Sequence, residues 1–468
     1  MTVTRRQISA AAGPAIAALG FLLSATAYFP GLFTPDSMDQ FAQSQSGHFA
    51  DWHPPVMAML WRAFNFIHVG PELLFGFHLA LFWIGVWAIG DGLTRRDLTY
   101  GALFPLIGLL PFVFNYLGLL WKDVAVAAAW TFAAGLAFRR QAGHVKPHTI
   151  EQVCVWAAFA YGVLARANTI FAAAPLAFYL LGGNLFSRRL WPQITAMLLV
   201  PALLLAGSAA FNKYVARAEP QYATSSLFLF DLAGISHRLK KNLIPGPWTA
   251  AQERQIPNCY GPDKWDHTGM GECAFVTRTL DDRDLSGSPI LTHAWISAIL
   301  SHPMEYLGHR LAYINDLMRW LGPVPTRDAF METEIADPRY ANTPGPLFRA
   351  IEGVCEALTD TPLFRPYFWL LVAVSAAGLS FAADNSPQRQ VAGALSFSAL
   401  IYLLTYIPFG VASDFRYAYW SIIADLGAGA ALLACRWRNA RVLGAIASPS
   451  AIGVIAMIGS SIVSQMRT

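Results

Sequence analysis

Residues 8–29, "ISAAAGPAIAALGFLLSATAYF", form a long run of apolar and small residues directly after Arg5 and Arg6. A helix of this length rises about 33 Å, enough to cross the hydrocarbon core of a bilayer. The run is too long for the core of a signal peptide, and its end, "TAYFPG", is a poor cleavage site. We therefore expect a retained membrane helix.

The rest of the chain has the same apolar character. Of its 468 residues, 55% are hydrophobic and 13% are charged, whereas soluble proteins carry about a quarter charged residues. Further apolar blocks of roughly 17–25 residues recur, each long enough to span a membrane as a helix. The sequence thus predicts an all-α polytopic membrane protein. The formal charge of +4 is small, and no basic run indicates nucleic acid as a partner.

These blocks predict about eleven transmembrane helices. They lie near residues 8–29, 72–90, 100–118, 123–138, 150–165, 169–183, 190–210, 364–382, 391–409, 416–434 and 441–463. Basic clusters occupy alternate loops, at Arg5 and Arg6, Arg95 and Arg96, Arg139, Arg140 and Lys146, Arg188 and Arg189, Arg389, and Arg436, Arg438 and Arg441. Because Lys and Arg concentrate in cytoplasmic loops, this pattern puts the N-terminus inside and the C-terminus outside.

This orientation requires that segment 55–69 does not cross the membrane. As a helix of about 15 residues, the segment would rise only about 22 Å, against a hydrocarbon core of about 30 Å. It also carries Arg62 and Asn65 near its middle. We interpret it as an interfacial or re-entrant helix in the first outer loop.

The predicted topology gathers polar motifs from distant parts of the chain on the outer face. They are residues 30–70, "LLWKD" (119–123), "RAN" (166–168), the long stretch 211–362 and "SDFRY" (413–417). We therefore divide the chain into a catalytic transmembrane module at 1–210 with its first outer loop at 30–70, an outer-face region at 211–362, and C-terminal transmembrane helices at 363–468. We expect a multi-pass protein of the cell's inner (plasma) membrane whose active site lies on the outer face.

The outer-face region is rich in Pro, Gly and charged residues, with helical patches near 288–301 and 303–320. Cys259 and Cys273 would close a loop of about 15 residues, and on an oxidising face such a disulfide contributes about 3 kcal/mol. The alternative is two unpaired thiols. The other cysteines, Cys154, Cys355 and Cys435, are expected to be unpaired.

An acidic motif begins the first outer loop. Asp36 and Asp39 are three residues apart, so on a helix they share a face. A carboxylate there could accept the proton of an acceptor hydroxyl or amine. The structural alternative is helix capping, with Thr34 as N-cap, Pro35 at the first helical position and an acid in the first turn. Capping explains one acid but not the second.

The stretch "HFADWHPP" offers a possible divalent metal site at His48, Asp51 and His53. Its spacing fits no standard zinc pattern. Alternatively, Asp51 and His53 anchor the loop or contact an anionic substrate.

Cationic residues occur at the outer ends of several predicted spans. Lys122 and Asp123 begin one span, Arg166 and Asn168 lie in a tight turn between two others, and Asp414, Arg416 and Tyr417 begin a later one. Ionisable side chains at span ends commonly reach to the interface without further function. A phosphate in the outer headgroup zone, however, requires cations at this level, and Lys122, Arg166 and Arg416 are the candidates.

With these motifs in order, the chain resembles the GT-C superfamily of membrane glycosyltransferases, which includes protein O-mannosyltransferases and lipid A aminoarabinose transferases. The resemblance rests on Asp36 in the first outer loop, His53–Pro55, Asp123 after "PFVFNY", and the Asp-x-Arg-Tyr at Asp414, Arg416 and Tyr417. It covers the first seven spans best and does not extend to 211–362.

The resemblance implies a polyprenyl-phosphate sugar as donor and a glycan, lipid or protein as acceptor. Asp36 would act as general base in an inverting transfer, and cations would stabilise the leaving phosphate. The candidate catalytic residues are Asp36, Asp39, His53 and Asp123. The candidate substrate-binding residues are Asp51, Lys122, Arg166, Asn168, Asp414, Arg416 and Tyr417.

Two other classes of protein fit some of these features. A lipid-linked oligosaccharide ligase, a polymerase or an acyltransferase would also work on the outer face with Arg and His, although the early acid followed by His-Pro-Pro favours a glycosyltransferase. A transporter would place charges near the middle of spans and break its helices in paired halves. Here the ionisable residues lie mainly at span ends.

Overall fold

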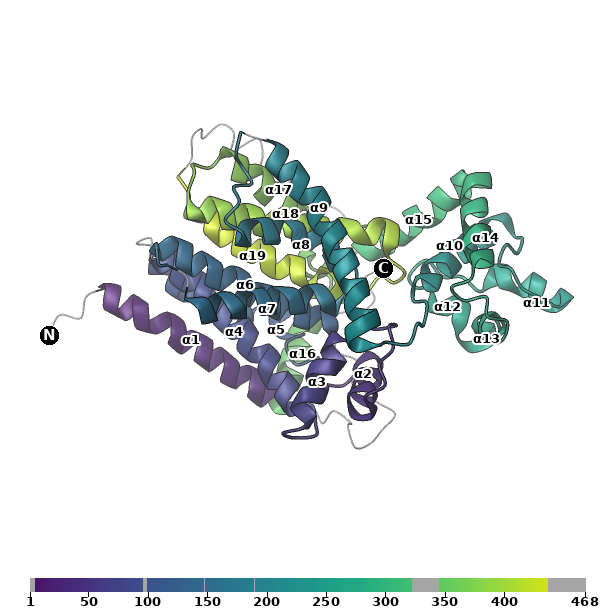
Figure 1. The fold of residues 1–468 in the computed structure, drawn as a ribbon, viewed down its shortest axis with the longest axis horizontal. Helices are drawn as coiled ribbons and strands as arrows, with labels where there is room; N and C mark the ends of the chain where they lie inside the picture. Colours follow the sequence, from purple (N-terminus) through teal and green to yellow (C-terminus); the bar gives the residue numbers. More distant parts are fainter. Residues whose placement is uncertain (1–4, 96–98, 147, 189, 322–344, 437–468) are drawn as a thin grey trace.

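The computed structural model describes residues 5–95, 99–146, 148–188, 190–321 and 345–436, and its regular elements are helices (Figure 1). The long helices that pack side by side are α1 (Arg5–Tyr28), α4 (Glu72–Thr94), α6 (Lys122–Gly143), α7 (Thr149–Ala165), α8 (Thr169–Leu180), α9 (Leu190–Ala210), α17 (Pro366–Ala382), α18 (Pro387–Phe409) and α19 (Tyr419–Leu433). We call this group the bundle.

The lengths and composition of these helices are those of a helical membrane protein. Among the described residues, four helices are long and apolar enough to cross a bilayer: Ala11–Tyr28, Glu72–Thr94, Leu190–Ala216 and Pro387–Phe409. The third of these ranges, Leu190–Ala216, consists of α9 and the π-helix Phe211–Ala216 that extends it. Shorter apolar helices accompany them, and the predicted span 441–463 lies outside the described residues.

The region expected as a single span at 100–118 differs from a continuous α-helix. It forms a 3-10 helix, Thr99–Leu109, followed by the one-turn α5, Pro111–Phe114. Pro105 and Pro111 lack the amide hydrogen that an α-helix needs in its interior. The segment also packs tightly, because a Cβ on Gly108 would lie 2.6 Å from the Trp83 ring.

Small residues allow α4 and α6 to pack closely. A Cβ built on Gly85 would lie 2.6 Å from the backbone nitrogen of Phe132, and one on Gly135 would lie 2.5 Å from the Gly85 carbonyl oxygen. Such approaches are typical of helix contacts inside membranes, where packing rather than hydrophobic burial drives association. This contact fixes Lys122 and Asp123 at one end of the bundle, in the first turn of α6.

Residues 30–70, expected from the sequence to be the first outer loop, hold two short helices, α2 (Pro35–Ser46) and α3 (Val56–Asn65). Helix α3 occupies the segment expected to be interfacial, and the side chains of Phe66, Ile67 and Val69 that follow it are exposed. The loop is fastened at two places. Leu32 exchanges backbone hydrogen bonds with Gly118 and Leu120, at 2.8 and 3.2 Å, and Glu219 does so with Phe49 and Asp51, at 2.8 and 3.1 Å.

Beyond one end of the bundle lies a separate group of helices (Figure 1). It consists of α10 (Thr224–Leu239), α11 (Ala250–Gln255), α12 (Asp266–Gly269), α13 (Ala274–Asp282), α14 (Pro289–Ser301) and α15 (Pro303–Met318), with 3-10 turns at Ile256–Asn258 and Gly271–Cys273. The two expected helical patches correspond to α14 and α15. A second hydrophobic core, which includes Leu232, Ile256 and Leu280, lies within this group.

Helix α16 (Pro346–Leu358) belongs to the bundle although it falls in the stretch assigned to the outer-face region. Its buried residues Phe348 and Cys355 are part of the bundle core, and Phe348 packs edge-on against Tyr28 of α1. Short 3-10 turns at Pro362–Phe364 and Phe415–Ala418 then introduce α17 and α19.

Candidate functional site

The site begins at the N-terminus of α2, where Asp36 occupies the first turn. Thr34 caps this helix, since its side chain accepts from the Ser37 amide while the Ser37 hydroxyl accepts from the Thr34 amide. Trp121 donates its indole N–H to the Thr34 hydroxyl at 2.7 Å. The cap is therefore tied to the residue that precedes Lys122, which sets the position of Asp36 relative to α6.

Arg416 joins two acids that are far apart in the sequence. Its Nη1 donates to Asp36 Oδ2 at 3.0 Å and its Nε to Asp414 Oδ2 at 2.8 Å. The guanidinium also lies over the Trp121 ring, 4.4 Å from the centroid. Asp36, Asp414 and the Trp121 ring thus hold the Arg416 guanidinium in place. Its Nη1 points at the Asp36 carboxylate.

These charges decide the protonation of Asp36. Burial alone would raise the pKa of the Asp36 carboxyl, but the charges of Arg416 and Lys122 outweigh burial and hold that pKa well below its usual range. The carboxylate is therefore ionised at any physiological pH. Its side chain is still 29% exposed, so a group arriving from outside the protein can reach it.

His53 links Asp36 to Lys122. The ammonium of Lys122 donates to His53 Nδ1 at 2.7 Å, and His53 Nε2 lies 4.0 Å from Asp36 Oδ1. Burial and the adjacent ammonium lower the pKa of His53 to about 3. The imidazole is therefore neutral, with its proton on Nε2, the nitrogen that faces Asp36.

Lys122 differs from the two arginines in its partners. Arg416 and Arg166 each form an ion pair with a carboxylate, whereas none of the described carboxylates pairs with Lys122. Its hydrogen-bond partner is the neutral His53. The Lys122 ammonium is therefore available to pair with an anion that enters the site.

Asp123 and Arg166 form a buried ion pair at the same end of the bundle. Arg166 Nη1 donates to Asp123 Oδ2, its Nε donates to Asn168 Oδ1 at 3.0 Å, and Tyr402 donates to Asp123 Oδ1 at 3.5 Å. The Asp123 side chain is 1% exposed. A carboxylate so enclosed cannot contact a substrate directly, so its evident role is to hold Arg166.

Two tyrosines of α18 join this pair. Tyr406 stacks on Tyr417 with ring centroids 4.6 Å apart, and the Arg166 guanidinium lies 4.7 Å from the Tyr417 centroid and 5.6 Å from that of Tyr406. Sequence reasoning had missed Tyr402 and Tyr406. Their four-residue spacing near the end of an apolar helix, which puts both hydroxyls on one face, could have indicated them.

A cavity of about 380 Å³ opens between these groups. Lys122, Arg166 and Asn168 form its polar wall. The aromatic residues Trp52, Tyr406 and Tyr417, the apolar residues Phe171, Leu227, Phe409 and Val411, and the hydroxyl residues Thr224, Ser226 and Thr405 form most of the remainder. Phe171 and Phe409 stack on one another and are about half exposed. The cavity therefore combines cations with an apolar rim.

The other predicted site residues lie apart from this cavity. Asp39 is exposed and accepts from the Gln43 side chain at 2.7 Å. Asp51 accepts from the Gln221 amide at 2.6 Å, a contact that fastens the first outer loop. His48 is exposed. His48, Asp51 and His53 do not converge, and among the described residues no three acidic, His or Cys side chains could hold a metal ion.

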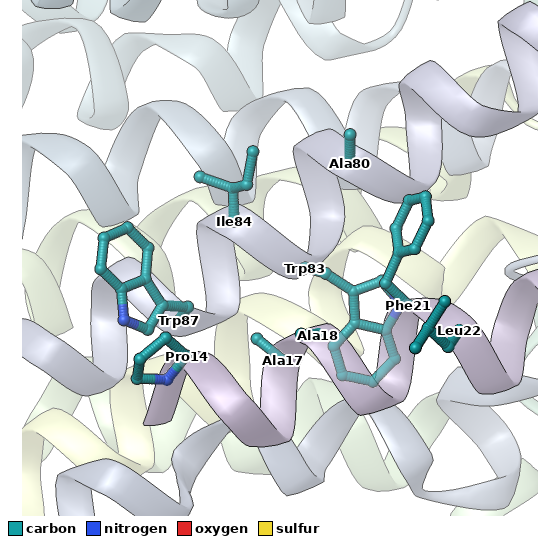
Figure 2. Close-up of a pocket in the computed structure, with 9 residues that line it drawn as sticks. All are labelled: Pro14, Ala17, Ala18, Phe21, Leu22, Ala80, Trp83, Ile84 and Trp87. Carbon is teal, nitrogen blue, oxygen red and sulfur yellow. The ribbon is translucent and has the colours of Figure 1, made fainter. Parts of the chain in front are cut away.

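Two further cavities have a different character. One of about 460 Å³ lies between α1 and α4 and is lined by apolar residues, with Trp83 and Trp87 facing α1 (Figure 2). The other, of about 380 Å³, includes Arg62, whose Nη1 donates to the carbonyls of Ser44 and Gln45 at 3.1 Å. Arg62 thereby caps the C-terminal end of α2.

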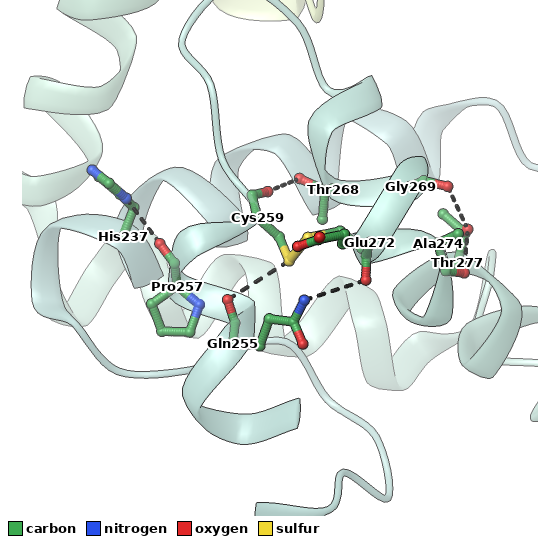
Figure 3. Close-up of a disulfide and its surroundings, with 10 residues drawn as sticks. His237, Gln255, Pro257, Cys259, Thr268, Gly269, Glu272, Ala274 and Thr277 are labelled. Atoms are coloured by element: carbon green, nitrogen blue, oxygen red, sulfur yellow. Dashed lines mark hydrogen bonds between the residues drawn. A yellow bond between two sulfur atoms is a disulfide. The ribbon is translucent and has the colours of Figure 1, made fainter. Parts of the chain in front are cut away.

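The structure joins Cys259 and Cys273 in the disulfide expected from their spacing, whereas Cys154, Cys355 and Cys435 are free. The surrounding loop is held by hydrogen bonds from side chains to backbone carbonyls. The Thr268 hydroxyl donates to the Cys259 carbonyl at 2.8 Å, and the Gln255 side chain donates to the Glu272 carbonyl at 3.3 Å (Figure 3).

Comparison with known proteins finds no matching family model, no matching curated protein and no matching solved structure.

Proposed function

We propose that this protein is a membrane glycosyltransferase that moves a sugar from a polyprenyl-phosphate donor to an acceptor on the outer face of the plasma membrane. The observation that carries the proposal is the cavity that has Lys122 and Arg166 on one wall and Phe171 and Phe409 at its rim. Lys122 joins this cavity to Asp36 through His53. A ligand that satisfies both ends must carry an anionic head and an apolar tail.

Lys122 is the residue best suited to bind the phosphate. It lines the cavity and is not neutralised by a described carboxylate. A partly buried ammonium that lacks an ion-pair partner gains a strong charge-assisted hydrogen bond when an anion arrives. Arg166 adds a second, fixed positive charge from the same wall. The exposed rings of Phe171 and Phe409 offer a surface for the lipid chain.

Asp36 acts as the base on the acceptor. In the free protein its low pKa makes it a weak proton acceptor, because Brønsted efficiency rises as the pKa approaches the working pH. An anionic donor bound at Lys122 offsets part of the positive potential that keeps this pKa low. Donor binding therefore strengthens Asp36 as a base at the moment when transfer becomes possible.

The reaction follows as a single displacement. The acceptor hydroxyl or amine approaches Asp36 from its exposed side, while the donor phosphate is held in the cavity behind His53 and Lys122. Attack on the anomeric carbon forms the new glycosidic bond as the bond to the phosphate breaks. The phosphate leaves with the electron pair and is stabilised by Lys122 and Arg166, while Asp36 takes the acceptor proton. A single in-line displacement inverts the anomeric centre.

The proposal includes the topology of about eleven spans, with the N-terminus inside and the site outside. Two exposed positions test this orientation. In a Cys154→Ser background, a Lys146→Cys variant in the loop before α7 should react with an impermeant maleimide only from the inside, and a Glu253→Cys variant of α11 only from the outside. Labelling of both from the same side would overturn the scheme.

The function itself is tested by incubating the purified full-length protein, in lipid nanodiscs, with a panel of radiolabelled polyprenyl-phosphate sugars and a crude envelope extract as acceptor source. We expect transfer from one donor, and Asp36→Asn should abolish it. Asp39→Asn is the matched control, since Asp39 is exposed and does not line the cavity. If Asp36→Asn retains full activity, Asp36 is not the base. Uptake of a solute without label transfer would identify a transporter instead.

A further inference from the structure

Three consecutive carbonyl groups between α18 and α19 are held by residues of the helix group α10–α15. Because this group lies beyond one end of the bundle, we call it the outer helices. Gly410 accepts from Arg310 Nη1 at 2.8 Å, Val411 accepts from the Trp265 amide at 2.8 Å, and Ala412 accepts from the Tyr313 hydroxyl at 3.1 Å. A segment of exposed backbone would leave these groups to water. Here each one is used by a residue from α15 or the loop before α12.

One of these donors, Arg310, is itself fixed by a buried carboxylate. Asp231 of α10 is inaccessible to solvent and forms an ion pair with Arg310 Nη2 at 2.7 Å. It also accepts from Trp295 at 2.7 Å and from His309 Nε2 at 3.0 Å. Arg310 therefore uses one Nη on Asp231 and the other on Gly410. This planar fork explains why an arginine suits the position.

The disulfide loop belongs to the same network. Tyr260, next to Cys259, donates to His309 Nδ1 at 2.9 Å, and Lys264 pairs with Ala412 in an isolated antiparallel bridge. The loop that Cys259 and Cys273 close thus carries Tyr260, Lys264 and Trp265 against α15 and segment 410–412. Trp265 also packs against Trp52 of the cavity wall, with ring centroids 5.7 Å apart.

The segment held in this way is part of the candidate site. Gly410 and Val411 line the cavity, and the chain continues directly to Asp414 and Arg416. The fit at Gly410 leaves no room for a side chain, since a Cβ there would lie 1.7 Å from the Tyr313 hydroxyl oxygen. The position of Arg416 relative to Asp36 therefore depends on where the outer helices hold residues 410–412.

We propose that the outer helices position the Arg416–Asp36 pair through segment 410–412, with Arg310 as the central positioning residue. Arg310 contacts neither Asp36 nor Arg416 in the structure, and it acts through the backbone that carries Arg416. Only the expected effect of Arg310 on sugar transfer rests on the proposed function. The effect on the segment itself is independent of any reaction.

Hydrogen exchange followed by mass spectrometry tests the positioning directly. In Arg310→Met, the peptides that cover residues 405–420 should exchange at least ten times faster than in the wild type. Tyr313→Phe, which removes a single oxygen, should give a smaller increase in the same peptides. Trp295→Phe is the matched control, because it also removes one donor from Asp231 but makes no contact with segment 410–412. It should leave these peptides unchanged.

Kinetics supply the second measurement. Arg310→Met should lower kcat about tenfold or more while the KM for the donor changes less than threefold, since Lys122 and Arg166 remain in place. The acid limb of its pH profile should also move to higher pH, because a displaced Arg416 no longer holds the pKa of Asp36 down. A general loss of folding would not produce this shift.

Two results would overturn the positioning role. One is unchanged exchange at 405–420 in both Arg310→Met and Tyr313→Phe, and the other is an equal increase in Trp295→Phe. If the wild type transfers no sugar, the proposed function fails, but the exchange measurement still decides whether the outer helices hold the segment.

Discussion

Arg416 donates a 3.0 Å hydrogen bond to Asp36 across a sequence separation of 380 residues, and it binds Asp414 with the other edge of its guanidinium. The contact joins the first outer loop to the start of α19. It also keeps the carboxylate of Asp36 ionised in the absence of any ligand, because the charge of Arg416 outweighs the effect of burial on the pKa.

Replacing Arg416 should therefore change the pH dependence of transfer. In Arg416→Gln the pKa of Asp36 rises, so Asp36 becomes protonated at a higher pH and activity is lost earlier as the pH falls. We expect the acid limb of kcat/KM to move up by about one to three pH units, the usual effect of removing an opposite charge at this distance. Asp414→Asn should shift it much less, because the Arg416–Asp36 contact remains. Superimposable profiles for Arg416→Gln and wild type would contradict this account.

Lys122→Met should weaken donor binding more than any other single change of a cavity cation. A hydrogen bond to a charged group contributes about 1.5–3 kcal/mol, which corresponds to an increase in the donor KM of about 10-fold to 150-fold. Competition by unlabelled polyprenyl phosphate measures the same loss without chemistry. Lys213→Gln, a change of an exposed lysine away from the cavity, is the control for net charge. Equal effects of the two variants would rule out a specific phosphate contact.

The buried pair of Asp123 and Arg166 should show strong energetic coupling. Removing either partner leaves a buried charge alone, which costs about 3–5 kcal/mol. Asp123→Asn and Arg166→Gln should each lower the temperature of thermal unfolding in detergent. The double variant should lose less than the sum of the two, since it leaves no isolated charge. Strict additivity would mean that the two side chains do not interact.

His53 should make the protein less stable in mild acid. Its pKa is 6.5 in an unfolded chain and about 3 in the fold. Below pH 6.5 the unfolded state therefore binds a proton that the folded state does not, and stability falls as the pH decreases from 6.5 toward 3. His53→Asn keeps an acceptor for Lys122 but does not titrate. Thermal unfolding of both proteins is measured in detergent between pH 6.5 and pH 4.5. The unfolding temperature of His53→Asn should fall less over this range than that of the wild type. Parallel decline of the two proteins would assign the loss to other groups.

The disulfide between Cys259 and Cys273 should stabilise the outer helices rather than the whole protein. Replacing Cys259 and Cys273 by serine should destabilise the outer helices by about 3 kcal/mol, as expected for a loop with a sequence separation of 14 residues. Limited proteolysis should then cut between residues 259 and 273 faster than in the wild type. Cys154→Ser, which removes an exposed free thiol, should not change the cleavage rate. A rise in cleavage for the control as well would point to a global effect.

Much of the fold could be predicted from the apolar blocks, because length and hydrophobicity are local properties. The helices at Glu72–Thr94, Leu190–Ala210 and Pro387–Phe409 begin or end within a few residues of the expected spans. The stretch 100–118 was expected as one span, and in the structure it forms a 3-10 helix followed by the short α5, because Pro105 lacks the amide hydrogen that an α-helix needs in its interior. Helix α16 was missed because its pairing with α1 and α5 is not visible in the local pattern.

For the candidate site, too, the sequence identified some features and only the tertiary structure showed others. Sequence order indicated which residues were unusual for an apolar chain, including Asp36, His53, Lys122, Arg166 and Arg416. It could not assign partners among them, because ion pairing depends on distances that are set by helix packing. Asp51 was a candidate for substrate contact, and the structure uses its carboxylate to bind the Gln221 amide.

By itself, then, the sequence determined an all-helical protein of membrane composition and the set of charged residues that interrupt it, since both follow from the free energy of transferring side chains into lipid. Only the tertiary structure decided that Arg416 meets Asp36, that Asp123 is enclosed with Arg166, and that Lys122 lies at the cavity wall without a described carboxylate as ion-pair partner. Segment 410–412 is the clearest case. Its backbone carbonyls carry no sequence information, and their donors Arg310, Trp265 and Tyr313 reach them only when the outer helices have folded against the bundle.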